Sequence, residues 1–188
     1  GLNTAAINLA VGYFYGVLIR ELNIAPLIKA LPVTPIEPGN THITIAYIGD
    51  KPPSQEADDK VGTIIGSTPC FTVKLGQLTL LPSPAKPRVL AIEVTSNEQL
   101  SKLRTAIISA LRDSGIAISD RFLGDFKPHI TIAYIRTKKV DPHELLENAR
   151  ELGIEEELVG KTLLINAISL ILAKENNYRE ITRHKLKC

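Results

Sequence analysis

The stretch HITIAYI occupies residues 42–48 and occurs again, unchanged, at residues 129–135. Seven identities in a row indicate an internal duplication rather than chance. Two copies are too few for a solenoid, which needs at least about three stacked repeats. We therefore expect residues 1–188 to form a single α+β domain with two related, pseudo-symmetric lobes, each of which contains one copy.

The segments that follow the two copies have a matching order. Each copy precedes an apolar run typical of a strand, and a second strand comes after that run, so each half is predicted to end in a hairpin. The second hairpin turns at Glu175-Asn176-Asn177, residue types that favour turns. The predicted strands, apart from the two copies, span 12–19, 71–81, 88–94, 162–173 and 178–186.

Helices are predicted in the remaining segments. Across 98–113 apolar residues recur at helical spacing, and Gly115 can cap the C-terminus. A second helix is predicted to start at Asp141 as N-cap, with Pro142 in the first turn, and to end at Gly153. Weaker helical patterns lie near 21–31 and 55–66.

The charge and cysteine content restrict the class of ligand and the cellular setting. A net charge of +2, from 22 basic and 20 acidic residues, provides no overall field for gripping a long duplex, so a small phosphorylated ligand or a nucleic-acid end fits better. Two cysteines, Cys70 and Cys188, are too few for a disulfide framework or a cysteine-rich zinc site, and a reducing, cytoplasmic setting is expected. The uncharged stretch 1–19 is interrupted by polar residues, so we expect a buried first strand there rather than a targeting segment or membrane anchor.

HITIAYI is rich in β-branched residues and should be extended, with side chains that alternate between faces. His42 and Thr44 then share one face, and Ile43, Ile45 and Tyr47 point to the core. The second copy places His129 and Thr131 in the same way. If the two halves pack with pseudo-twofold symmetry, the two His/Thr faces meet across a shared groove.

Two imidazoles and two hydroxyls facing one groove suit phosphoryl transfer. A neutral imidazole can take a proton from the attacking oxygen, an imidazolium can give one to the leaving oxygen, and hydroxyls can hydrogen-bond the non-bridging oxygens. Histidine populates both protonation states near neutral pH, which predicts a bell-shaped rate profile. This chemistry needs no cofactor.

Other interpretations of the histidines are weaker. A single histidine in an apolar strand is usually a hydrogen-bonded structural residue, but a duplicated His/Thr pair at corresponding points favours catalysis. A zinc site would need a third and fourth ligand, which the sequence does not place near the pairs, so no metal is expected. His143 and His184 are interpreted as structural.

The paired His-x-Thr motifs resemble those of the 2H phosphoesterase superfamily. The resemblance extends to 39–42, 47–50, 87–90 and 126–129, and it is strongest to the LigT-like RNA 2',3'-cyclic phosphodiesterases, also called 2'-5' RNA ligases. It implies a two-lobed, duplicated α+β fold in which antiparallel sheets line a central groove and helices lie outside. It also implies hydrolysis of RNA 2',3'-cyclic phosphate ends to 2'-phosphates, with His42 as proton donor and His129 as proton acceptor.

Further site residues follow from the same resemblance, as does one departure from it. Many relatives carry an arginine where this chain has Tyr134, and Arg136 lies two positions further on. Tyr134, Arg136 and Phe126 are the candidates for substrate binding, with Phe126 able to stack on an unpaired base. RNA ends or small cyclic nucleotides are the expected partners of a monomer that does not bind membranes. Two alternatives stay open: 2'-5' RNA ligation by the same groups, and a non-catalytic module that binds nucleotides or RNA ends.

Overall fold

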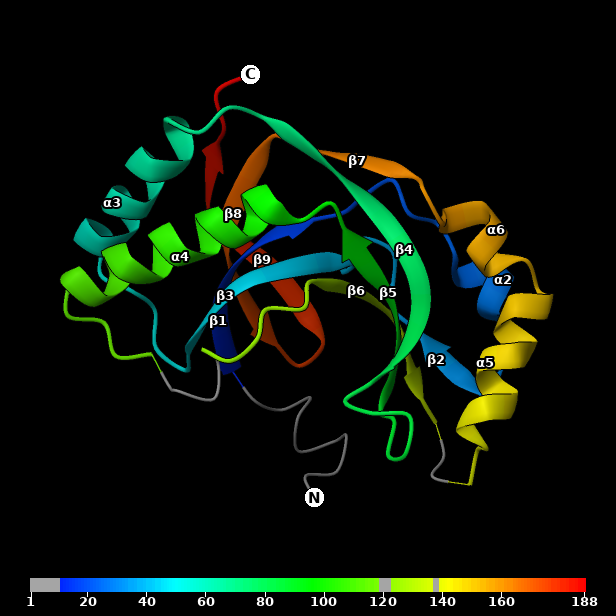
Figure 1. The fold of residues 1–188 in the computed structure, drawn as a ribbon. Coiled ribbons are helices and arrows are strands. Elements are labelled where there is room, and N and C mark those ends of the chain that lie inside the picture. The colour runs from blue at the N-terminus through cyan, green and yellow to red at the C-terminus, as the bar shows by residue number, and fades with distance from the viewer. Residues whose placement is uncertain (1–10, 119–122, 137–138) are drawn as a thin grey trace.

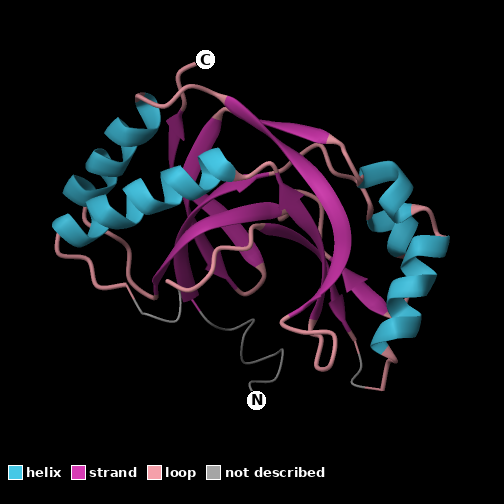
Figure 2. Cartoon of the chain, in the orientation of Figure 1, coloured by secondary structure: helices cyan, strands magenta, loops and turns pink. Residues whose placement is uncertain are grey.

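The computed structural model describes residues 11–118, 123–136 and 139–188, so residues 1–10 of the uncharged stretch lie outside the described residues. In the described part, nine strands form one curled sheet, and the helices pack outside it (Figures 1 and 2). The strands are β1 Val11–Leu18, β2 Val33–Pro35, β3 His42–Gly49, β4 Phe71–Leu81, β5 Val89–Thr95, β6 His129–Ile135, β7 Thr162–Ile165, β8 Ala167–Lys174 and β9 Asn177–Lys185.

The two HITIAYI strands lie side by side at the centre of the sheet. The strand order is β7-β4-β5-β6-β3-β1-β8-β9, with β2 paired to β6, and neighbouring strands run antiparallel. The β4–β5 hairpin follows the first copy in sequence but pairs with the second copy, β6. The β8–β9 hairpin follows the second copy but joins β1 beside the first copy, β3. Each lobe is thus assembled from both halves of the chain.

The predicted α+β class, with two lobes and outer helices, is confirmed, and the two expected sheets are joined into one through β3 and β6. The predicted strand 162–173 is wrong as one element. It divides at Asn166 into β7, which pairs with β4, and β8, which pairs with β1. One residue therefore connects strands that are far apart in the sheet order, which requires the sheet to curl almost closed at this end.

The same end of the curled sheet is closed by the C-terminal residues. Lys187 accepts a hydrogen bond from the Cys70 backbone N–H at 3.1 Å and donates one to the Thr68 carbonyl at 2.8 Å. Cys70 and Cys188 form a disulfide, with their Cα atoms 5.1 Å apart. This bond was not expected from the cysteine count, and disulfides are uncommon in a reducing compartment.

Two groups of helices cover the sheet on opposite sides of Figure 1. α3 (Gln55–Gly66) and α4 (Glu98–Asp113) pack together over the lobe that contains β3 and β9. α5 (Pro142–Glu151) and α6 (Ile154–Leu158) pack together against β4, and α2 (Ala25–Ile28) contacts β2.

The predicted helix boundaries are mostly confirmed. Asp141 caps α5 by accepting a hydrogen bond from the His143 N–H at 3.0 Å, and Gly115 follows α4 with a φ of 82°. The helix expected near 21–31 is only a single turn, and β2 and α6 were not predicted. No helix among the described residues is long and apolar enough to cross a bilayer.

Candidate active site

The two His/Thr pairs meet on one face of the central strands. β3 and β6 pair antiparallel at Ile43 and Ile130, and both isoleucines are completely buried on the other face. Antiparallel pairing at this point sets His42 across from Thr131, and Thr44 across from His129. All four of these polar side chains are half-buried. The predicted pairing of two imidazoles and two hydroxyls on one face is therefore present, with the histidines at diagonal corners.

Both imidazoles are held in the same way. His42 Nδ1 lies 2.9 Å from the carbonyl oxygen of Asn40, and His129 Nδ1 lies 2.9 Å from that of Lys127, each two residues earlier. A carbonyl can only accept, so Nδ1 carries the proton in each ring. Nε2 is then the nitrogen that gains or loses a proton, which is the arrangement that a general acid or base requires.

A bulge in each copy changes which face the tyrosine occupies. The pairing of β1 with β3 shifts register between Tyr15 and Gly16, next to Ile45, and the pairing of β5 with β6 shifts between Leu90 and Ala91. After such a shift the alternation of faces is reversed. Two successive buried residues, Ile-Ala, precede a half-buried tyrosine in both copies.

Tyr47 and Tyr134 consequently turn to the groove face. The expectation that Tyr47 points to the core is wrong: its hydroxyl fills the space above Gly12, where a Cβ would meet it at 2.1 Å. Tyr134 lies near Tyr178 on β9, and the two tyrosines line the same cavity. Burial first, and then the proximity of Tyr134, raise the pKa of Tyr178 well above its ordinary value, so this phenol stays protonated.

Aromatic rings enclose His42. The centroids of Tyr178 and Phe14 lie 4.5 Å and 5.0 Å from that of the imidazole. Burial lowers the pKa of His42, the hydrogen bond to Asn40 opposes this effect, and the nearby His129 lowers the pKa further. The neutral form of His42 is thus favoured when no ligand is bound.

His129 has different surroundings. It lines a cavity of about 270 Å³ together with Phe126, Lys127 and Glu93. Glu93 is the residue that pairs with His129 across β5 and β6, so the two side chains stand on the same face. The Arg104 guanidinium carbon lies 5.0 Å from the centre of the Phe126 ring, over one of its faces.

The three expected substrate-binding residues have different positions. Tyr134 lines a cavity together with Tyr178, the ring that packs on His42, and Phe126 lines the cavity that contains His129. Arg136 follows β6, and its guanidinium Nη2 donates to the Leu31 carbonyl at 3.0 Å, which directs it to the turn before β2. The structure therefore gives Arg136 a backbone partner away from the histidines.

The other two histidines each contact an acidic side chain. His184 Nε2 lies 2.9 Å from a carboxylate oxygen of Asp58, and His143 forms an exposed ion pair with Glu147 at 3.2 Å. Among the described residues, no group of three histidines, cysteines, aspartates or glutamates is placed to hold a metal.

Several site residues were not identified from the sequence. Phe14, Tyr178 and Glu93 come from neighbouring strands, and their positions depend on the pairing of the hairpins. Asn40 had a local signal, because its place two residues before His42 repeats that of Lys127 before His129. The identical backbone contacts show why that spacing matters.

Curated relatives share the sequence over much of its length. An RNA 2',3'-cyclic phosphodiesterase of Archaeoglobus fulgidus is 25% identical over 134 residues, which are 68% of this chain and 72% of the relative. A protein of the same name from Aquifex aeolicus is 29% identical over 136 residues, 70% of this chain and 71% of the relative.

Solved structures share the fold. A crystal structure from Thermus thermophilus has a TM-score of 0.69 at 18% identity and covers 93% of this chain and 97% of its own. E. coli LigT complexed with 3'-AMP has a TM-score of 0.63 at 20% identity, covering 94% and 98%. The family model of the 2'-5' RNA ligase superfamily matches residues 32–176, which include both copies of HITIAYI. The chain therefore belongs to the 2'-5' RNA ligase superfamily, the 2H phosphoesterases.

Proposed function

We propose that the protein hydrolyses RNA 2',3'-cyclic phosphate ends to 2'-phosphates without a metal, with His42 as proton donor and His129 as proton acceptor. The observation that carries this proposal is the pair of imidazoles on adjacent antiparallel strands, each with Nδ1 fixed by a backbone carbonyl. Diagonal placement suits an in-line displacement, since the incoming and leaving oxygens lie on opposite sides of phosphorus.

The proposed step involves two proton transfers, one at the attacking water and one at the leaving oxygen. His129 Nε2 takes a proton from water as the water oxygen bonds to phosphorus, and the bond from phosphorus to O3' breaks. His42 Nε2 gives a proton to O3', which leaves a 2'-phosphate and a free 3'-hydroxyl. Thr44 and Thr131 donate hydrogen bonds to the non-bridging oxygens, where negative charge accumulates. Exchange with solvent restores the starting protonation states.

To act as the proton donor, His42 must be protonated when substrate is bound. Burial favours its neutral form in the unliganded protein. A phosphodiester carries a negative charge, and an opposite charge within hydrogen-bond distance favours the imidazolium. We therefore expect the bound phosphate to raise the pKa of His42, so that substrate binding itself prepares the acid.

The relatives support this activity. Those from Archaeoglobus fulgidus and Aquifex aeolicus are named RNA 2',3'-cyclic phosphodiesterases, and LigT has been crystallised with 3'-AMP and with ATP. We propose by extension that the chain acts as a cytoplasmic monomer on RNA ends. Alkylation of free thiols at the moment of lysis, followed by mass measurement, tests the compartment: Cys70 and Cys188 should both be modified in a reducing compartment, and a disulfide already present at lysis would contradict the cytoplasmic setting.

The decisive experiment uses an RNA that ends in a 2',3'-cyclic phosphate, with EDTA present throughout. The expected product is a 2'-phosphate, which chromatography separates from the 3'-phosphate. Loss of activity on chelation, or a 3'-phosphate as product, would contradict the proposal. Adding an RNA with a 5'-hydroxyl tests the ligase alternative, because that hydroxyl replaces water as the attacking group and a longer RNA appears.

A further inference from the structure

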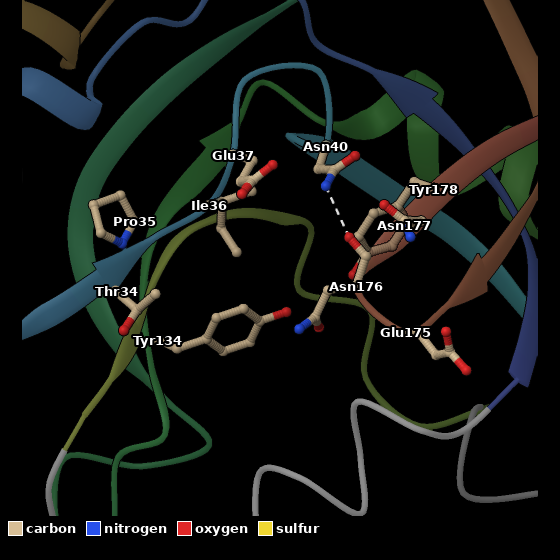
Figure 3. A pocket seen from close by; sticks show the side chains of 10 residues that line it. All are labelled: Thr34, Pro35, Ile36, Glu37, Asn40, Tyr134, Glu175, Asn176, Asn177 and Tyr178. Carbon is tan, nitrogen blue, oxygen red and sulfur yellow. Dashed lines mark hydrogen bonds between the residues drawn. The ribbon is translucent and has the colours of Figure 1, made fainter.

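A cavity of about 240 Å³ is lined by two neighbours of His42, which does not line it itself. Its wall contains Tyr178, whose ring lies 4.5 Å from that of His42, and Asn40, whose carbonyl holds Nδ1 of the same imidazole. Figure 3 shows the lining side chains around this space. A group attached to a phosphate between the two histidines, on the side of His42, would therefore enter this cavity.

One wall is set by the turn that precedes β3. The Asn40 N–H donates to the Glu37 carbonyl at 3.0 Å, which closes a turn over 37–40. Proline in the second position and Gly39 in the third, with a φ of 92°, are the features of a type II turn. The turn fixes the backbone from which the Glu37 side chain extends to the rim of the cavity.

The opposite wall is formed by the β8–β9 hairpin and the end of β6. The Asn40 side-chain amide donates to the Asn176 carbonyl at 2.8 Å, which ties the hairpin to the turn (Figure 3). Asn176 has a φ of 64°, a left-handed conformation that suits the tight turn. Tyr178 and Tyr134 both line this side of the cavity. Both walls are thus connected through Asn40 to the strand that carries His42.

The residues that line the cavity indicate that it binds a flat chemical group without negative charge. It includes two carboxylates, Glu37 and Glu175, and none of its residues, all of which are described, is a lysine or arginine. A second phosphate would be repelled there. Carboxylates only accept hydrogen bonds, and the tyrosine rings offer apolar faces. A nucleobase that presents donors fits these properties, since single-stranded RNA is read by stacking and by the edges of its bases.

Among the four RNA bases, guanine presents two neighbouring donors, N1–H and the N2 amino group, on one edge. We propose that this cavity is the subsite for the base of the terminal nucleotide, and that the Glu37 carboxylate selects guanine by accepting from both donors. The assignment rests on the proposed function, in which O3' leaves toward His42 and so places the terminal nucleoside on that side.

The test compares guanosine, inosine and adenosine nucleotides, because inosine keeps N1–H but lacks the N2 amino group. Binding of the 3'-monophosphates is measured by calorimetry, and kcat/KM is measured with the 2',3'-cyclic forms. We expect the order guanosine, inosine, adenosine, with guanosine favoured over adenosine about tenfold, or about 1.4 kcal/mol. In Glu37→Gln a donating NH₂ group replaces one of the two accepting oxygens, so the paired contact with both guanine donors is lost and the guanosine-to-adenosine ratio should fall to about one. Glu157→Gln, at an exposed position on α6, is the matched control and should keep the ratio.

The outcomes separate the subsite from the activity. Equal binding of guanosine and adenosine 3'-monophosphates by the wild type, or a ratio unchanged in Glu37→Gln, overturns the subsite even if cyclic nucleotides are hydrolysed. A preference for 3'-GMP that depends on Glu37 supports the subsite even if no cyclic nucleotide is hydrolysed, and in that case the proposed function is what fails.

Discussion

The two copies of HITIAYI have one backbone geometry and two environments. In both, the imidazole Nδ1 is held by the carbonyl two residues earlier, and a bulge brings the tyrosine to the groove. The strands added beside them differ. Leu18 pairs with His42, which is packed under Phe14 and Tyr178, whereas Glu93 pairs with His129, which lines a cavity of about 270 Å³.

This difference in the packing around the two histidines shows how the copies of a duplicated motif can acquire unequal roles in proton transfer. The backbone carbonyl two residues before each copy fixes the tautomer and the direction of each ring, and this contact is the same in both copies. Protonation depends on what packs around the ring, and that comes from strands outside the copies. Variants of the shared residues should therefore have similar effects in both copies, and variants of the surroundings should not.

Removing either imidazole should have the largest effect. His42→Ala and His129→Ala should each lower kcat about 10²- to 10⁴-fold, the usual contribution of a positioned acid or base. The double variant should be little worse than either single one, because the two groups act in the same step. Single-turnover hydrolysis of a cyclic nucleotide measures all three. A double variant whose loss is the product of the single losses would show that the histidines act independently.

Removing the threonine hydroxyls tests the symmetry of the motif. Thr44→Val and Thr131→Val keep the shape of the side chain and remove a donor, so each should lower kcat about 10²-fold, as loss of an oxyanion donor does. KM should change less, since the charge on these oxygens grows in the transition state. A loss confined to one of the two threonines would mean that the phosphate is held by a single copy.

Opening the packing around His42 should change its titration. Tyr178→Ala removes the ring that buries the imidazole, so the pKa of His42 should rise toward its ordinary value. The rise follows because burial disfavours the charged form. NMR titration of the histidine ring signals measures it, with Phe126→Ala, beside His129, as the control. An unchanged titration in Tyr178→Ala would assign the low pKa to another cause.

The sequence was sufficient for the shared part of this comparison and not for the rest. The duplication follows from the identity of two segments, and the His/Thr faces and the helix at 98–113 follow from periodicity within one segment. Tyr47 was misplaced because a bulge reverses the alternation of faces after Ile45. Phe14, Glu93 and Tyr178 could not be assigned, because strand order is set by long-range pairing that local patterns do not report.

The lobe that buries His42 also contains a buried polar network, which links a helix to two strands of the sheet. Asp58 on α3 accepts hydrogen bonds from the Tyr15 hydroxyl at 2.7 Å and from His184 Nε2 at 2.9 Å, which joins the helix to β1 and β9. Burial alone would raise the pKa of Asp58, but the bonds from His184 and Tyr15 outweigh burial and lower it.

Acid should weaken this network. Because the folded pKa of Asp58 lies below the unfolded one, its contribution to stability is present above the unfolded pKa and is lost as pH falls through the folded pKa. Asp58→Ala should lower the free energy of unfolding at pH 7 by about 3 kcal/mol, since it leaves polar partners buried. Urea unfolding at pH 7 and pH 3 measures both effects. The variant should show a smaller loss of stability between the two pH values than the wild type.

Two glycines of α3 test how closely His184 packs against this helix, with the smallest expected effect. They lie one turn apart on the same helix. A Cβ added at Gly62 would meet His184 Nδ1 at 2.7 Å, whereas at Gly66 the nearest atom within reach is the Lys185 carbonyl oxygen at 4.0 Å. The imidazole of His184 cannot move aside without breaking its bond to Asp58. Gly62→Ala should thus destabilise by about 1–3 kcal/mol through overpacking. Gly66→Ala should be neutral or stabilise by up to about 1 kcal/mol, because alanine is the better helix former. Equal effects of the two substitutions on urea unfolding would mean that His184 is not held against α3 in solution.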